Sequence, residues 1–68
     1  MNKKIIKAVS RRILQTMMVD EKQLRMLLET ETEGVPDRQL DGLMVKIEQL
    51  LNRLANNQNK IMLLQEIV

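Results

Sequence analysis

The sequence contains no cysteine, no histidine and no aromatic residue, and it has only two glycines and one proline. Without cysteine and histidine, the 68-residue chain can form neither a disulfide nor an ordinary zinc site. Without aromatic side chains, it lacks the residues that anchor many interfaces and that stack on nucleic-acid bases. A sheet is also disfavoured, because strands are enriched in aromatic and β-branched residues.

Catalytic groups are equally scarce. Ser10 is the only serine, and neither histidine nor cysteine is present to act as a base or a nucleophile. Two glycines are too few for a phosphate-cradling loop. Five carboxylates surround Gly34 without the spacing of a calcium loop, namely Glu29, Glu31, Glu33, Asp37 and Asp41. We therefore interpret them as a solvated acidic turn, and we predict a non-enzymatic protein without cofactor or metal.

Long apolar runs are missing as well. No stretch of 18 apolar residues occurs, so we expect no integral membrane insertion. The basic opening resembles that of a signal peptide, but charged and polar residues interrupt the apolar segment that should follow it. We therefore expect a cytoplasmic protein.

What the sequence does contain is mostly good helix formers, divided by one strong break at Gly34 and Pro36. Gly34 suits the position just after a helix, and Pro36 suits the start of the next one. We predict an all-α fold with a single domain over residues 1–68. It should be an antiparallel helical hairpin with a first arm over 3–32, a turn over 33–36 and a second arm over 37–67.

The second arm carries the clearest pattern, an apolar heptad repeat over four repeats. One series runs Leu40, Ile47, Leu54, Ile61 and Val68, and the other runs Leu43, Leu50, Asn57 and Leu64. Further apolar residues widen this stripe on one side, namely Met44, Leu51, Ala55 and Met62. Because a two-helix contact covers only the heptad seam, the wider stripe predicts a homodimer that forms a four-helix bundle. Asn57 is the one polar seam residue, which we interpret either as a determinant of oligomer register or as a hydrated defect.

The first arm places seven apolar residues on one face, namely Ile6, Val9, Ile13, Met17, Leu24, Leu27 and Leu28. Asp20 interrupts that face, and two interpretations remain open. Asp20 and Gln23 have the spacing of a capping box, so the arm is either two helices with a break at Val19–Asp20 or one long helix. In the second case Asp20 is exposed or faces an opposed basic residue. A three-helix dimer is the corresponding alternative fold.

Charge is segregated along the chain. The first 19 residues carry five bases and no acid, namely Lys3, Lys4, Lys7, Arg11 and Arg12. Such a basic patch either keeps a packed helix soluble or contacts phosphates, an anionic membrane or an acidic protein surface. Leu14 and Met18 lie on the polar side of the same helix, where a simple core helix would not place them.

Apolar residues also surround the C-terminal end of the second arm, which an exposed helix end would not normally show. We interpret this end either as buried by the partner chain and the basic first arm or as a docking surface for another protein. We predict Leu14, Met18, Leu63 and Ile67 as partner-contact residues, with Lys7 and Arg11 steering the partner. The leading hypothesis is a small regulatory or adaptor protein of bacterial or phage type that acts through protein–protein contacts as a helical oligomer. One alternative is a nucleic-acid-binding regulator that uses the basic patch. Another is a structural or chaperone-like subunit of a larger helical assembly.

Overall fold

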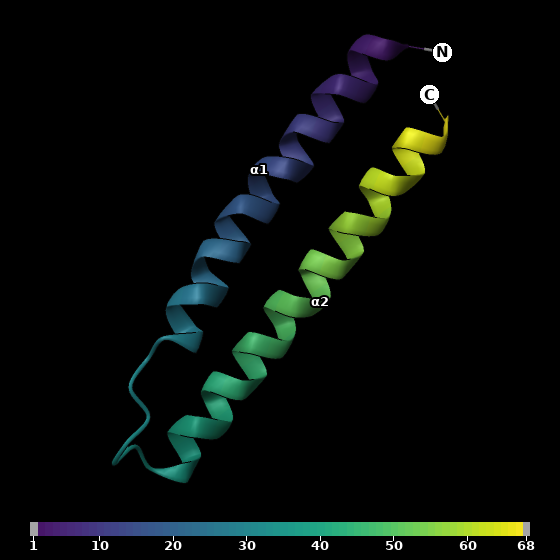
Figure 1. Ribbon diagram of the computed structural model, residues 1–68. Coiled ribbons are helices and arrows are strands. Elements are labelled where there is room, and N and C mark those ends of the chain that lie inside the picture. Colours follow the sequence, from purple (N-terminus) through teal and green to yellow (C-terminus); the bar gives the residue numbers. More distant parts are fainter. Residues whose placement is uncertain (1, 68) are drawn as a thin grey trace.

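The computed structural model describes residues 2–67 and consists of two long helices joined by a loop. Helix α1 spans Lys3–Leu28 and helix α2 spans Asp37–Ile67, and no strand occurs within the described residues. The helices run antiparallel and side by side, so the start of α1 and the end of α2 lie at one end of the rod (Figure 1). The all-α helical hairpin predicted from the sequence is therefore confirmed. The rod measures 55 × 14 × 12 Å.

Helix α1 is continuous through Val19 and Asp20, so the two-helix interpretation of the first arm is wrong, and so is the three-helix fold that depended on it. Its first turn is capped by the Asn2 side chain, which accepts hydrogen bonds of 3.1 Å from the backbone N–H groups of Lys4 and Ile5. Asp20 does not cap a helix, because its carboxylate is occupied by a side chain of α2. The second interpretation, an acid facing an opposed base, is correct.

The loop between the helices is longer than the sequence predicted, because α1 ends at Leu28 rather than near residue 32. Three glutamates follow the helix closely, and negative charge is unfavourable at a helix C-terminus. Gly34 has a φ of +78° and therefore forms a bend within the loop, and it does not follow the helix directly. Pro36 precedes α2, and its carbonyl accepts the first backbone hydrogen bonds from Gln39 and Leu40.

The contact between the helices is a single heptad seam. In α2 the less exposed side chains are the predicted ones, namely Leu40, Leu43, Ile47, Leu50, Leu54, Asn57, Ile61 and Leu64. Val68, the last member of the predicted series, lies outside the described residues. In α1 they recur at alternating spacings of four and three, namely Ile6, Ser10, Ile13, Met17, Asp20, Leu24 and Leu27. Val9 and Leu28 were predicted on this face, but both are exposed because the seam is only two residues wide.

This seam encloses very little. Within the described part of the chain only three residues are buried, and two of them are polar: Asp20 at 2% exposure of the whole residue, Leu50 at 3% and Asn57 at 8%. The chain exposes 5936 Å². A compact monomer of this mass would expose roughly 4,500 Å², or about 1,500 Å² less. The hairpin therefore exposes more surface than a compact domain of its mass.

Candidate protein-contact surfaces

A strong polar interaction across the seam joins Asp20 of α1 to Arg53 of α2. Arg53 donates from Nε and Nη2 to the two carboxylate oxygens of Asp20, each over 2.7 Å. The Asp20 side chain is 3% exposed, whereas that of Arg53 is 57% exposed. The hydrogen bonds with Asp20, followed by its charge, raise the pKa of the Arg53 guanidinium above its ordinary value. The pair therefore fixes the register of the helices from one edge of the seam.

Arg53 also identifies that edge. One shallow hollow on this edge is lined by Arg53 together with Thr16 and Val19 of α1. A second hollow is lined by Met26 of α1 and Lys46 of α2. By heptad spacing, Lys60 and Ile67 continue the line of Lys46 and Arg53 along α2. We call this side the Arg53 face. Its apolar members are Ile5, Val9, Val19, Met26, Leu63 and Ile67, and its charged members are Arg12, Lys46, Arg53 and Lys60.

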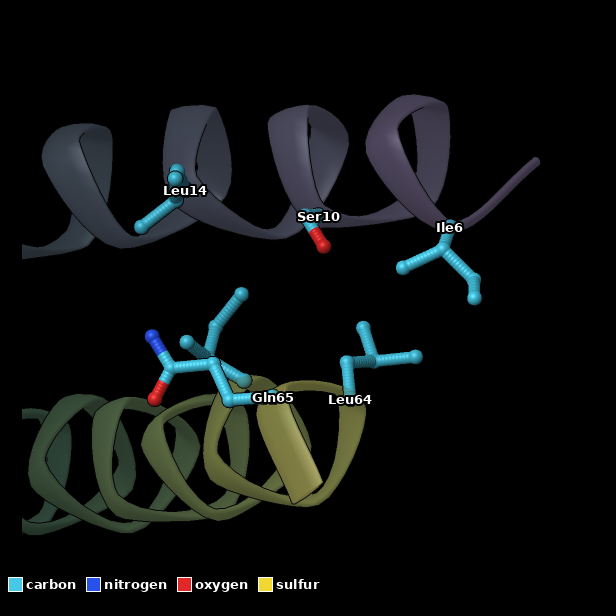
Figure 2. Close-up of a pocket in the computed structure, with 6 residues that line it drawn as sticks. Ile6, Ser10, Leu14, Leu64 and Gln65 are labelled. Atoms are coloured by element: carbon cyan, nitrogen blue, oxygen red, sulfur yellow. The ribbon is translucent and has the colours of Figure 1, made fainter. Parts of the chain in front are cut away.

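The opposite edge is bordered by Leu14. There an open groove of about 300 Å³ lies between the start of α1 and the end of α2. Figure 2 shows Ile6 and Leu64 pointing toward one another from the two helices, with Ser10, Leu14 and Gln65 beside them. Heptad spacing places further apolar side chains on this side. We call it the Leu14 face, and its apolar members are Leu14, Met18, Leu28, Met44, Leu51, Ala55 and Met62.

The two faces together account for nearly all of the large apolar side chains that the hairpin leaves exposed. Those on the Leu14 face range from 49% exposed for Leu14 and Leu51 to 70% for Met18. Those on the Arg53 face range from 40% for Val9 to 62% for Met26. Val45, at the back of α2, belongs to neither face. Stripes of this length on both sides of a seam are typical of helices that contact more than one neighbour.

The four predicted contact residues therefore do not form one site. Leu14 and Met18 lie on the Leu14 face, whereas Leu63 and Ile67 lie on the Arg53 face. All four are exposed, between 45% and 70%. Their role in binding a partner stays a prediction, but the structure assigns them to two separate surfaces.

The five residues of the basic patch lie on the first three turns of α1 and are all exposed. Within residues 2–67 the ion pairs are Arg25–Glu21 and Arg53–Asp20, so no base of the patch pairs with an acid of the described chain. Lys7 and Arg11 lie beside Leu14, and Arg12 lies on the Arg53 face. Because the helices are antiparallel, Lys60 near the end of α2 lies toward the same end of the rod.

Asn57 is enclosed between the two helices of one chain. No fully buried side-chain nitrogen or oxygen in the described residues lacks a hydrogen-bond partner. The burial of Asn57 does not require a second copy. Its role in oligomer register stays a prediction, and the structure places it within the seam of one hairpin.

Two residues were not recognised from the sequence, one in the seam and one at its edge. Ser10 occupies a seam position at the groove, and the alternating spacing of four and three that includes Ser10 and Asp20 was the signal for it. Arg53 was not recognised as the partner of Asp20. In an antiparallel hairpin centred on the turn, these two residues lie at about the same level, which was the available signal.

The part of the chain described by the structure shows no helix long and apolar enough to cross a membrane. Nor does it gather three acidic side chains in a way that would hold a metal ion. Searches for a matching protein family, for a similar curated protein and for a similar solved structure found no match. The interpretation of function therefore rests on the two faces and on the distribution of charge.

Proposed function

We propose that this chain is a small non-enzymatic adaptor or regulatory protein that works through protein–protein contacts as a helical oligomer. One observation carries the proposal. Thirteen large apolar side chains are exposed, whereas only Leu50 is buried among the apolar residues of the described hairpin. An apolar surface of that extent is stabilised when other helices cover it.

The Arg53 face is the surface that we assign to a different protein. Its charged residues are all basic, so two copies facing each other here would place like charges together. Four of its six apolar residues lie at the open end of the rod, where Leu63 and Ile67 of α2 are on the same face as Ile5 and Val9 of α1. An amphipathic helix with acidic flanks complements this arrangement.

An affinity pull-down from a bacterial lysate, with and without nuclease, tests the proposal. The baits are the natural chain, a Leu63→Asp/Ile67→Asp variant and a Val45→Asp variant. Val45 is a matched control, because it is 53% exposed but lies on neither face. We expect a specific protein to be retained by the natural and Val45→Asp baits after nuclease, and to be lost with the double variant.

Two results would contradict this assignment. Retention by all three baits would show that the Arg53 face is not the contact surface. Loss of every retained protein after nuclease treatment would transfer the function to nucleic-acid binding.

The second candidate function, nucleic-acid binding, is favoured by the unpaired bases at the open end of the rod. Five bases on the first three turns supply phosphate contacts, and the resulting affinity should fall steeply with salt. Against it, the chain has no stacking residues and a net charge of only +2. A gel shift that persists to moderate salt would support this function, and no shift at low salt would remove it.

A third role, as a structural or chaperone-like subunit of a larger helical assembly, uses the same exposed faces. Such a subunit should be poorly folded or aggregated when isolated. A cooperative thermal melt of the isolated protein would count against it.

A further inference from the structure

We propose that the Leu14 face is covered by a second copy of this chain in antiparallel orientation, with the open end of each hairpin against the turn of the other. This inference rests on the proposed function, because it names one partner of the oligomer. It goes further by fixing which face pairs, in which direction and in which register.

The area that the hairpin exposes is large enough for an interface with a second copy of the chain. The surplus over a compact monomer is about 1,500 Å². A standard specific interface buries roughly 800 Å² on each partner. One face of the hairpin is therefore enough for a stable dimer, and the other face is left for a different protein.

The choice of face follows from charge. The Arg53 face presents only bases, whereas the Leu14 face presents charges of both signs, such as Arg11, Arg25, Glu21 and Glu48. Glu21 and Arg25 already pair with each other over 2.8 Å. A two-fold interface brings each face against itself, so only the mixed face avoids an excess of like charge.

The direction follows from the distribution of charge along the rod. The half at the open end, residues 2–18 and 55–67, carries six bases and one acid. The half at the turn, residues 19–54, carries eight acids and five bases. Antiparallel hairpins place each basic half against an acidic half, whereas parallel hairpins place the two basic ends together.

The register follows from the order of residues along α2. On the Leu14 face this helix presents, in sequence, Met44, Glu48, Leu51, Ala55, Gln58 and Met62. When a second copy runs the other way, Met44 meets Met62, Glu48 meets Gln58 and Leu51 meets Ala55. The order is self-complementary about the level of Arg53, so every apolar position contacts another apolar position.

The same placement also brings together the two leucines that α1 contributes to the Leu14 face. The level of Arg53 is that of Asp20 in α1, because these two side chains join across the seam. Reversal of α1 about a point next to Asp20 brings Leu14 against Leu28, and it carries Arg11 toward the glutamates of the loop. One antiparallel register therefore pairs apolar residues in both helices.

Distance measurement between spin labels on a Glu66→Cys variant tests the orientation, since the natural chain contains no cysteine. Glu66 is exposed and lies 13 positions beyond Arg53 in α2. With a rise of 1.5 Å per residue, the two labels of an antiparallel dimer should be about 40 Å apart. In a parallel dimer they should be under about 25 Å apart, because packed helix axes are only 8–10 Å apart.

A disulfide test checks the register. We expect a Met44→Cys/Met62→Cys variant to form a covalent dimer on mild oxidation, and neither single variant to do so. Both methionines are at least half exposed, so these changes should leave the hairpin folded, which circular dichroism verifies. A short label distance, or a chain that stays monomeric, would overturn the inference. A short distance would leave the proposed function intact, because the pull-down uses the Arg53 face.

Discussion

The guanidinium of Arg53 binds both carboxylate oxygens of Asp20, each over 2.7 Å, from the edge of a seam in which the carboxylate is almost fully enclosed. The two partners are unequal, because the acid is buried and the base is more than half exposed. Removal of the base leaves a buried carboxylate without a partner, whereas removal of the acid leaves a base that water can solvate. This difference can be measured.

We expect Arg53→Met to lower the melting temperature clearly more than Asp20→Leu does. Asp20→Leu should leave stability unchanged or raise it, because leucine suits the seam position. The double variant should melt near Asp20→Leu and above Arg53→Met. Thermal denaturation followed by circular dichroism measures all three, and equal losses for the two single variants would contradict the assigned roles.

Leu50 is the only buried apolar residue of the described hairpin, so we expect Leu50→Ala to be severely destabilising. Leucine-to-alanine changes in protein cores cost about 2–5 kcal/mol, through lost transfer free energy and the cavity that remains. Val45→Ala, on the back of the same helix, should cost well under about 1 kcal/mol. Urea denaturation compares the two, and similar costs would show that Leu50 is not at the centre of the seam.

Asn57 is a polar residue at a buried seam position, and we expect Asn57→Leu to stabilise the hairpin. A gain of about 1 kcal/mol would raise the melting temperature by roughly 4–8 °C in a domain of this size. The mass in solution, measured on the same sample, tests the predicted role in oligomer register. If the variant has the same mass as the natural chain, Asn57 does not determine the oligomeric state. A different mass would support its predicted role in oligomer register.

The two glycines provide a matched pair, because a Cβ added at either one would meet no atom within 4 Å. Gly34→Ala forces alanine to a φ of +78°, and we expect it to destabilise the chain by about 1 kcal/mol. Gly42→Ala lies inside α2, and we expect it to stabilise the chain by about 0.5–1 kcal/mol. Chemical denaturation measures the change in the free energy of unfolding for each variant. Changes of opposite sign would confirm that the two glycines have different backbone roles, and changes of the same sign would contradict it.

The sequence predicted the helical hairpin and the seam of α2, because heptad spacing in a long helix has only one geometric meaning. The seam of α1 was predicted less accurately, because Val9 and Leu28 were assigned to the core face. Those two belong to the flanks, and apolar flanks cannot be separated from a seam until the width of the contact is known. Asp20 was ambiguous for a related reason, since a capping box and a cross-helix ion pair share one local pattern.

The candidate sites were predicted only in part. Leu14, Met18, Leu63 and Ile67 were predicted to contact a partner, but their division between two faces depends on the pairing of helices across the seam. No local spacing contains that information. The position of Arg53 beside Asp20, which identifies the faces, also depends on the length of the loop.

The central claim is that exposed apolar faces of this hairpin are contact surfaces of a helical oligomer. Sedimentation equilibrium at about 100 µM, where an interface of micromolar affinity is filled, tests it most directly. The account predicts about 16 kDa, twice the chain mass of 8.0 kDa, for the natural chain and for Val45→Asp, and 8.0 kDa for Leu51→Asp. A natural chain that is folded by circular dichroism and sediments at 8.0 kDa would contradict it.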